Sequence, residues 1–120
     1  MRLFDAAIKS AGAKTALYLT WARKSAWQKQ AEITNAYESI GKELSATVVP
    51  AGLAWQRFLA GHGQPALHAA DQSHPTVAGT YLAACVFLQT LFAQSPAGNE
   101  APIAGLSDED RTQLQQAAIA

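Results

Sequence analysis

The chain has 120 residues, 49% of them hydrophobic, and its nine basic residues balance nine acidic ones to a formal net charge of zero. This length allows one domain at most, and the hydrophobic content excludes a disordered chain. The charge balance argues against partners recruited by overall charge, so we expect no nucleic acid and no anionic membrane surface as a partner.

The single cysteine, Cys85, excludes an internal disulfide and a thiolate zinc cluster, and its apolar neighbours predict a small buried side chain. The longest apolar run, residues 81–88, is far shorter than the about 20 residues that cross a membrane, so no membrane span is expected. No basic stretch followed by an apolar one opens the sequence, so no signal peptide is expected within these residues, and the localisation stays open.

The first half of the chain predicts two helix–strand units. Apolar residues at helical spacing over residues 3–11 predict a first helix. The apolar run 15–20 predicts a short strand buried on both faces, as is typical of a parallel sheet. After a loop at residues 21–27, an amphipathic pattern predicts a helix over residues 28–44. Thr47–Val49 then predicts a second strand.

The second half predicts helices only. Residues 53–61 indicate a short helix, and Pro75 fits the first turn of a longer one that runs to about residue 94. That longer helix is apolar nearly all round, so we expect it to be heavily buried. Ser107 and Asp110 predict a capping box for a final short helix. Two tryptophans on helix faces, Trp27 and Trp55, are expected in the core.

Strands that alternate with helices predict an α/β fold with a parallel sheet and right-handed crossovers. About two strands and five helices fall within this chain. A two-stranded parallel sheet leaves an apolar edge and too small a core, so the pattern predicts half of an α/β domain.

His74 follows Asp71 by three residues, on a predicted loop that enters a helix. A turn of this length can direct the carboxylate at one imidazole nitrogen. Such a hydrogen bond sets the tautomer and leaves the other nitrogen free to act as a base. The Asp-x-x-His spacing often arises by chance, so the residues around it decide whether it indicates a catalytic pair.

The run Asp71–Cys85, DQSHPTVAGTYLAAC, resembles the last conserved block of the SGNH (GDSL-type) hydrolases, where Asp-x-x-His-Pro precedes a glycine-containing apolar helix. Residues 12–23 resemble the penultimate strand of one bacterial branch of that family, and residues 92–96 fit the same branch. The resemblance covers nearly all of the chain. It divides the chain into the C-terminal part of a hydrolase domain, residues 1–98, and a tail, residues 99–120.

This resemblance implies a three-layer α/β/α (flavodoxin-like) fold, of which the chain would be the C-terminal half, and a serine esterase mechanism without a cofactor. It implies that His74 is the general base and that Asp71 orients it. The substrate implied is a small-molecule or carbohydrate ester that carries an acyl or acetyl group.

The nucleophile half of the family's pattern is missing. None of the seven serines lies in a Gly-Asp-Ser or Gly-x-Ser-x-Gly sequence, and neither Asn35 nor Asn99 belongs to a Gly-x-Asn-Asp block. The chain by itself is therefore expected to be nearly inactive. A second interpretation is a non-catalytic α/β interaction module, or a degenerate paralogue, that pairs its bare sheet edge with another chain.

Other candidate site residues have weaker patterns. Trp21 and Arg23 follow the first predicted strand, at the end where open parallel sheets bind ligands, so they could line a substrate pocket. A packed tryptophan beside a surface arginine is the alternative. His62, His68 and His74 are spaced by six residues without a helical pair, so no metal site is predicted.

Overall fold

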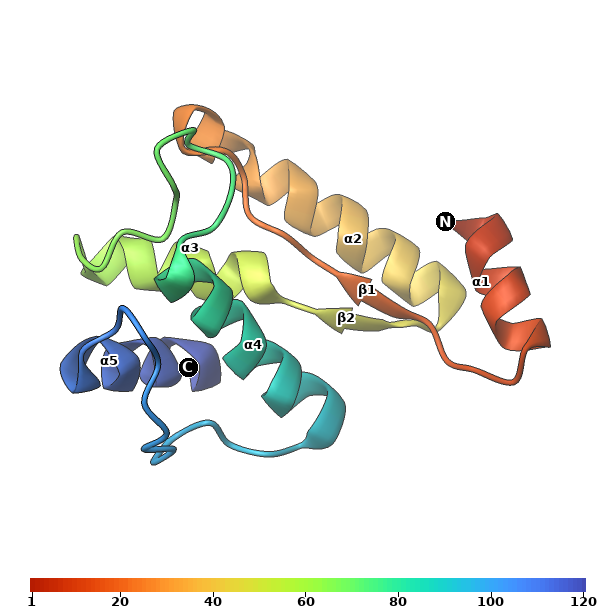
Figure 1. Cartoon of the computed structure of the whole chain (residues 1–120). Coiled ribbons are helices and arrows are strands. Elements are labelled where there is room, and N and C mark those ends of the chain that lie inside the picture. Colours follow the sequence, from red (N-terminus) through yellow and green to blue (C-terminus); the bar gives the residue numbers. More distant parts are fainter.

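A computed structural model describes all 120 residues. The elements are, in chain order, α1 (Arg2–Ser10), β1 (Ala16–Tyr18), the 3-10 helix η1 (Lys24–Lys29), α2 (Gln30–Leu44), β2 (Thr47–Val49), α3 (Ala51–Gly61), α4 (Val77–Phe92) and α5 (Asp108–Ile119) (Figure 1). The two strands pair in parallel, with Leu17 opposite Val48. The predicted mixed α/β class and the predicted order of helices and strands are confirmed. The loop expected at residues 21–27 is in part helical, since η1 begins within it.

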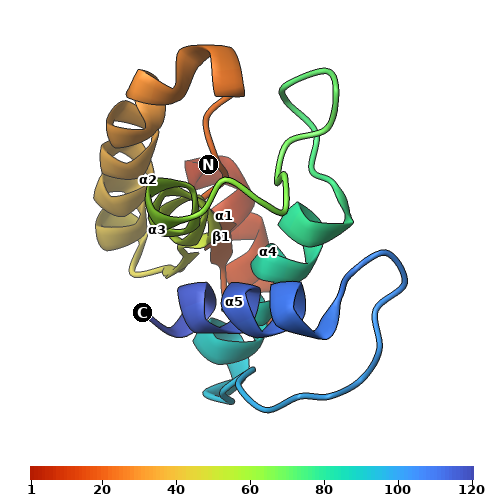
Figure 2. The same ribbon diagram turned by 90° about the vertical axis from the view of Figure 1, so that its left-hand side faces the viewer.

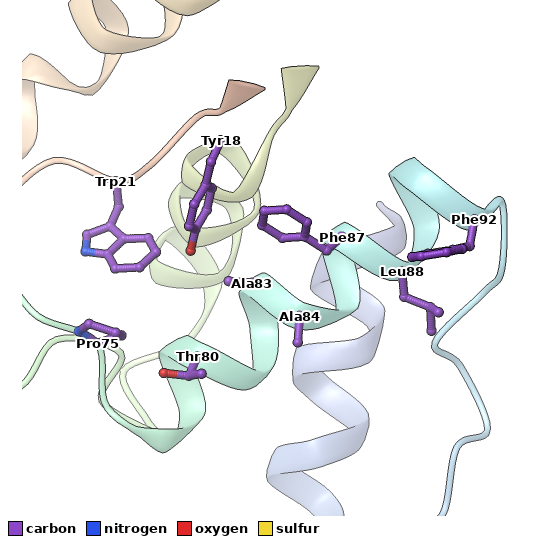
Figure 3. Close-up of a pocket in the computed structure, with 9 residues that line it drawn as sticks. All are labelled: Tyr18, Trp21, Pro75, Thr80, Ala83, Ala84, Phe87, Leu88 and Phe92. Carbon is purple, nitrogen blue, oxygen red and sulfur yellow. The ribbon is translucent and has the colours of Figure 1, made fainter. Parts of the chain in front are cut away.

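The sheet lies between α2 and α4 (Figures 1 and 2). On one side α2 approaches closely, because a Cβ atom added at Gly41 would lie only 2.5 Å from Cγ2 of Val48. On the other side Val49 is fully buried in the core, and the ring of Tyr18 meets Phe87 of α4 edge-on at a centroid distance of 4.8 Å (Figure 3). The sheet therefore has α2 against one face and α4 against the other.

The prediction that the first strand is buried on both faces is wrong. In β1 only Leu17 is buried, whereas Ala16 is exposed and Tyr18 retains 37% of its surface. The reason is that β1 has β2 on one side and no strand on the other. An edge strand keeps solvent access even where a helix contacts its face.

The core centres on α3 and α4. Trp55 and Phe58 of α3 are buried together with Leu82 and Val86 of α4 in one cluster. Cys85 is also buried, as the sequence predicts, and burial raises the pKa of its thiol. A raised pKa keeps this thiol protonated and unreactive.

Two expectations about α4 are corrected. The helix begins at Val77 rather than at Pro75, because the Thr76 hydroxyl caps it by accepting the N–H of Gly79 at 3.2 Å. Pro75 instead pairs as a short antiparallel bridge with His68. The helix is also less buried than expected, since its last turn points away from the core and Phe92 is 67% exposed.

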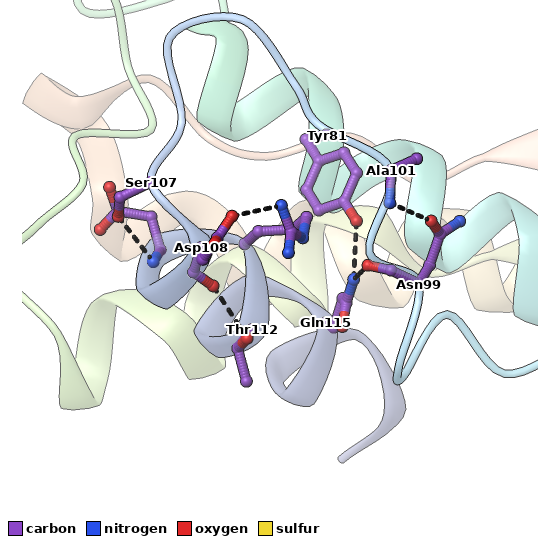
Figure 4. A network of polar contacts seen from close by, with 9 residues as sticks. Tyr81, Asn99, Ala101, Ser107, Asp108, Thr112 and Gln115 are labelled. Carbon is purple, nitrogen blue, oxygen red and sulfur yellow. Dashed lines mark hydrogen bonds and ion pairs between the residues drawn. The ribbon is translucent and has the colours of Figure 1, made fainter.

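The C-terminal helix α5 packs in the same core as α3 and α4, to which Leu114 contributes. The predicted cap is present, because the Ser107 Oγ atom accepts the N–H of Asp110 at 3.0 Å. The side chain of Gln115 ties this helix to α4 by donating to the Tyr81 hydroxyl at 2.9 Å (Figure 4). The tail predicted over residues 99–120 is thus part of the structural unit, and its helix is 12 residues long.

The close approach of α4 to α3 gives a first prediction. A Cβ atom at Gly79 would lie 2.5 Å from both the Leu67 carbonyl oxygen and Cζ2 of Trp55. We expect Gly79→Ala to lower the free energy of unfolding by about 1–3 kcal/mol, because overpacking outweighs the better helix propensity of alanine. Urea denaturation followed by circular dichroism measures this change.

Gly61→Ala is the matched control. Gly61 is the last residue of α3, and a Cβ atom there meets open space, so its stability should be unchanged or slightly higher. Equal stability of Gly79→Ala and the unsubstituted chain would contradict the close packing of α4 on Trp55.

Candidate active site

The turn that carries Asp71 and His74 is organised by the Asp71 carboxylate. Its Oδ1 atom accepts the backbone N–H groups of Ser73 at 3.0 Å and of His74 at 2.9 Å. Gln72, between Asp71 and Ser73, has a φ of 62° and so lies in the left-handed region. The second oxygen, Oδ2, forms a short hydrogen bond with Nδ1 of His74. The sequence prediction that these two side chains meet is thus matched by the geometry.

This hydrogen bond defines the protonation pattern of the pair. A carboxylate can only accept, so Nδ1 of His74 carries the hydrogen, and in the neutral ring Nε2 keeps its lone pair. The hydrogen bond from His74 is the main cause that lowers the pKa of Asp71, and the backbone N–H groups of Ser73 and His74 add to it. The imidazole is 81% exposed, so Nε2 faces solvent and is free to accept a proton.

The turn is anchored to the segment that follows β1. The indole Nε1–H of Trp21 donates to the Ser73 carbonyl oxygen at 3.0 Å, and the Lys24 N–H donates to the Gln72 carbonyl oxygen at 2.9 Å. Within the turn, the Ala69 N–H donates to the His74 carbonyl oxygen at 2.8 Å. The candidate base is therefore held beside the carboxyl end of a parallel strand, where ligands bind in open α/β sheets.

Trp21 and Arg23 have different environments. Trp21 stacks on Trp55 with ring centroids 3.7 Å apart and planes 3° from parallel, and it holds the turn through Ser73. Arg23 is exposed, and its guanidinium has no hydrogen bond or ion pair. Trp21 is thus a packed residue that positions the turn. A substrate-binding role for either residue stays a prediction.

The three histidines do not form a cluster. His62 stacks on Phe58, whereas His68 is buried and donates its Nε2–H to the Ala22 carbonyl oxygen at 3.0 Å. No group of three His, Cys, Asp or Glu side chains is arranged to hold a metal ion.

His68 is a residue whose role sequence reasoning missed. It packs edge-on against Trp55 and Trp27, and its backbone pairs with Pro75 at the end of the turn. His68 thereby links Trp55 to Pro75, the residue that follows His74. Neither its spacing nor its neighbours in the sequence indicates this contact.

A shallow apolar depression of about 500 Å³ begins beside the candidate base (Figure 3). Pro75, the residue after His74, lies at one end of it, and Phe92 lies at the other. Most of its lining is hydrophobic and none of it is charged: Tyr18, Trp21, Pro75, Thr80, Ala83, Ala84, Phe87, Leu88 and Phe92. An apolar group next to the imidazole would find a complementary surface here.

The nucleophile is not within hydrogen-bonding contact of this site. Asp71 is the only side chain that bonds to His74, and no serine hydroxyl reaches its Nε2 atom. The chain therefore presents a positioned base and its orienting carboxylate, without a group for the base to activate.

Comparison with protein-family models, with curated proteins and with solved structures finds no match for this chain. In the structure itself, no helix combines the length and the hydropathy that a membrane crossing needs.

The pKa of Asp71 gives a second prediction. Because its folded-state pKa is lowered, the carboxylate contributes stability in full above its unfolded-state pKa of about 3.9, and this contribution is lost as the pH falls further. We expect the unsubstituted chain to be more stable than Asp71→Asn at neutral pH. This difference should shrink below about pH 4. Urea denaturation of both proteins from neutral to acidic pH measures it.

Glu38→Gln removes an exposed carboxylate of α2 that makes no hydrogen bond, so it serves as the control and should show no comparable difference. A gap between Asp71→Asn and the unsubstituted chain that stays constant with pH would argue against the bonded carboxylate.

Proposed function

We propose that this chain supplies the Asp–His part of a Ser-His-Asp triad in an ester hydrolase of the SGNH type, acting on acyl or acetyl esters of small molecules or carbohydrates. The observation that carries the proposal is the hydrogen bond from His74 Nδ1 to Asp71 Oδ2 on a hydrogen-bonded turn, with Nε2 left open. The resemblance of the Asp71–Cys85 sequence to the family's last block supports the same assignment.

The roles follow from the two nitrogen atoms of the imidazole. Nε2 of His74 would take the proton of a serine hydroxyl as its oxygen attacks the ester carbonyl, and would then pass that proton to the leaving alcohol. Asp71 would stabilise the imidazolium between these steps, since its lowered pKa keeps it ionised. The serine and the donors for the oxyanion would come from polypeptide outside these 120 residues.

We further propose that the complete fold is a three-layer α/β/α sheet of the flavodoxin-like type. The placement of α2 and α4 against opposite faces of the parallel β1–β2 pair supports this proposal, as does the unpaired side of β1. The candidate base also follows the expected rule, because it lies beyond a strand's carboxyl end.

Hydrolysis of p-nitrophenyl acetate and p-nitrophenyl butyrate tests the function. The 120-residue chain should be nearly inactive. Its coding region extended upstream to an in-frame Gly-Asp-Ser-like block should yield an active esterase that reacts with a fluorophosphonate probe. In that protein we expect His74→Ala to lower kcat by about 10³-fold or more, and Asp71→Asn by about 10⁴-fold at most.

His62→Ala is the matched control, because this histidine is also exposed but packs on Phe58 away from the turn, and its activity should match the unsubstituted enzyme. An unchanged rate in His74→Ala would end the proposal. So would an upstream region without a serine that the probe labels.

The second candidate function, an α/β interaction module, is favoured by a separate observation. The outer edge of β1 is open and apolar side chains surround it.

A further inference from the structure

The exposed large hydrophobic side chains come from few elements of the fold. All of the large hydrophobic residues that remain exposed belong to α1, β1 or α4 or directly precede α1, and none belongs to α2, α3 or α5: Met1, Leu3, Phe4, Tyr18, Val77, Leu91 and Phe92. Two of them, Tyr18 and Phe92, line the same apolar depression, and exposed apolar surface of this kind is typical of an interaction site.

The strand β1 has a free hydrogen-bonding edge beside this surface. At its two ends, the Thr47 N–H donates to the Thr15 carbonyl oxygen at 3.2 Å and the Leu19 N–H donates to the Val49 carbonyl oxygen at 3.0 Å. Peptide groups alternate in direction along a strand, so the odd-numbered residues of β1 bond to β2. The N–H and C=O groups of Ala16 and Tyr18 consequently face outward, where the sheet has no further strand.

We propose that β1 pairs in the antiparallel sense with β1 of a second copy of this chain, about a two-fold axis at Leu17. In this register Ala16 of one copy lies opposite Tyr18 of the other. Residues opposite each other in a hydrogen-bonded antiparallel pair exchange both of their N–H···O=C bonds. The register therefore satisfies every outward-facing N–H and C=O of the two strands, which is the self-complementarity that a two-fold interface requires.

The side chains fit the same register. Tyr18 and Ala16 point to the α4 side of the sheet, so pairing sets each tyrosine beside the small alanine of the other copy. The apolar depression between β1 and α4 adjoins this edge and has no charged lining. A net charge of zero also leaves the two copies without long-range repulsion.

The exposed aromatic residues supply part of the area that a stable dimer needs. A standard interface takes about 800 Å² from each partner. Tyr18, Phe92 and Phe4, which are 37%, 67% and 74% exposed, together present roughly 350 Å² of side chain. The exposed aliphatic residues of α1 and α4 and the open backbone of β1 supply further area. Antiparallel pairing also brings the segment that precedes β1 in one copy, which includes α1, toward the end of β1 in the other.

Light scattering coupled to size-exclusion chromatography tests the proposal on the 120-residue chain. We expect a dimer at about 100 μM that dissociates on dilution toward about 1 μM. Ala16→Pro should weaken the dimer by about tenfold or more, because it removes an outward N–H from each strand while the bonds to β2 remain. Ala16→Ser keeps that N–H and is the matched control, which should dimerise as the unsubstituted chain does.

Amide hydrogen exchange provides the second readout. In the dimer the N–H groups of Ala16 and Tyr18 should be protected, and dilution should expose them. The Leu19 N–H, which is bonded to β2 in either state, should not change. A monomer at all concentrations would overturn the proposal, and so would a dimer in which the Ala16 and Tyr18 amides still exchange freely. Circular dichroism shows whether each variant is folded, so that a weakened dimer is not mistaken for an unfolded chain.

Discussion

The indole of Trp55 holds together the parts of the molecule that form the candidate site. One face of the ring stacks on Trp21, whose own N–H donates to the backbone of the turn that carries Asp71 and His74. The edge of the ring lies against Gly79, where even a methyl group would collide, so α4 is fixed in place next to it. Because the turn with His74 leads directly into α4, Trp55 supports the position of this turn together with the hydrogen bonds that the turn itself makes.

The candidate site and the open edge of the sheet each lack a partner group. His74 has its orienting carboxylate but no group to activate, and β1 has one strand neighbour but no second. Both gaps lie on the side of the molecule where Tyr18 and the outer face of α4 remain exposed. A strand that pairs with β1 would cover this apolar surface. The proposed second copy of the chain and the proposed polypeptide with the nucleophile would compete for this same edge of β1.

The Asp71–His74 pair is preorganised although it is exposed. An exposed ion pair by itself contributes little, because water screens it and the side chains lose freedom on pairing. Here the carboxylate is also fixed by two backbone N–H groups, and the turn is tied to Trp21 and Lys24. The chain itself therefore holds Asp71 and His74 in this geometry, which is the arrangement that the proposed general-base role requires.

Features that depend on neighbouring residues could be predicted from the amino-acid sequence. Helical periodicity and the short β-branched run at Thr47–Val49 set the order of elements, and the spacing of Asp71 and His74 brought their side chains together, because three residues can close one turn. Only the tertiary structure decided the rest. The buried role of His68 and the stacking of Trp21 on Trp55 arise between segments far apart in the chain, where packing chooses the partners and local residue patterns do not.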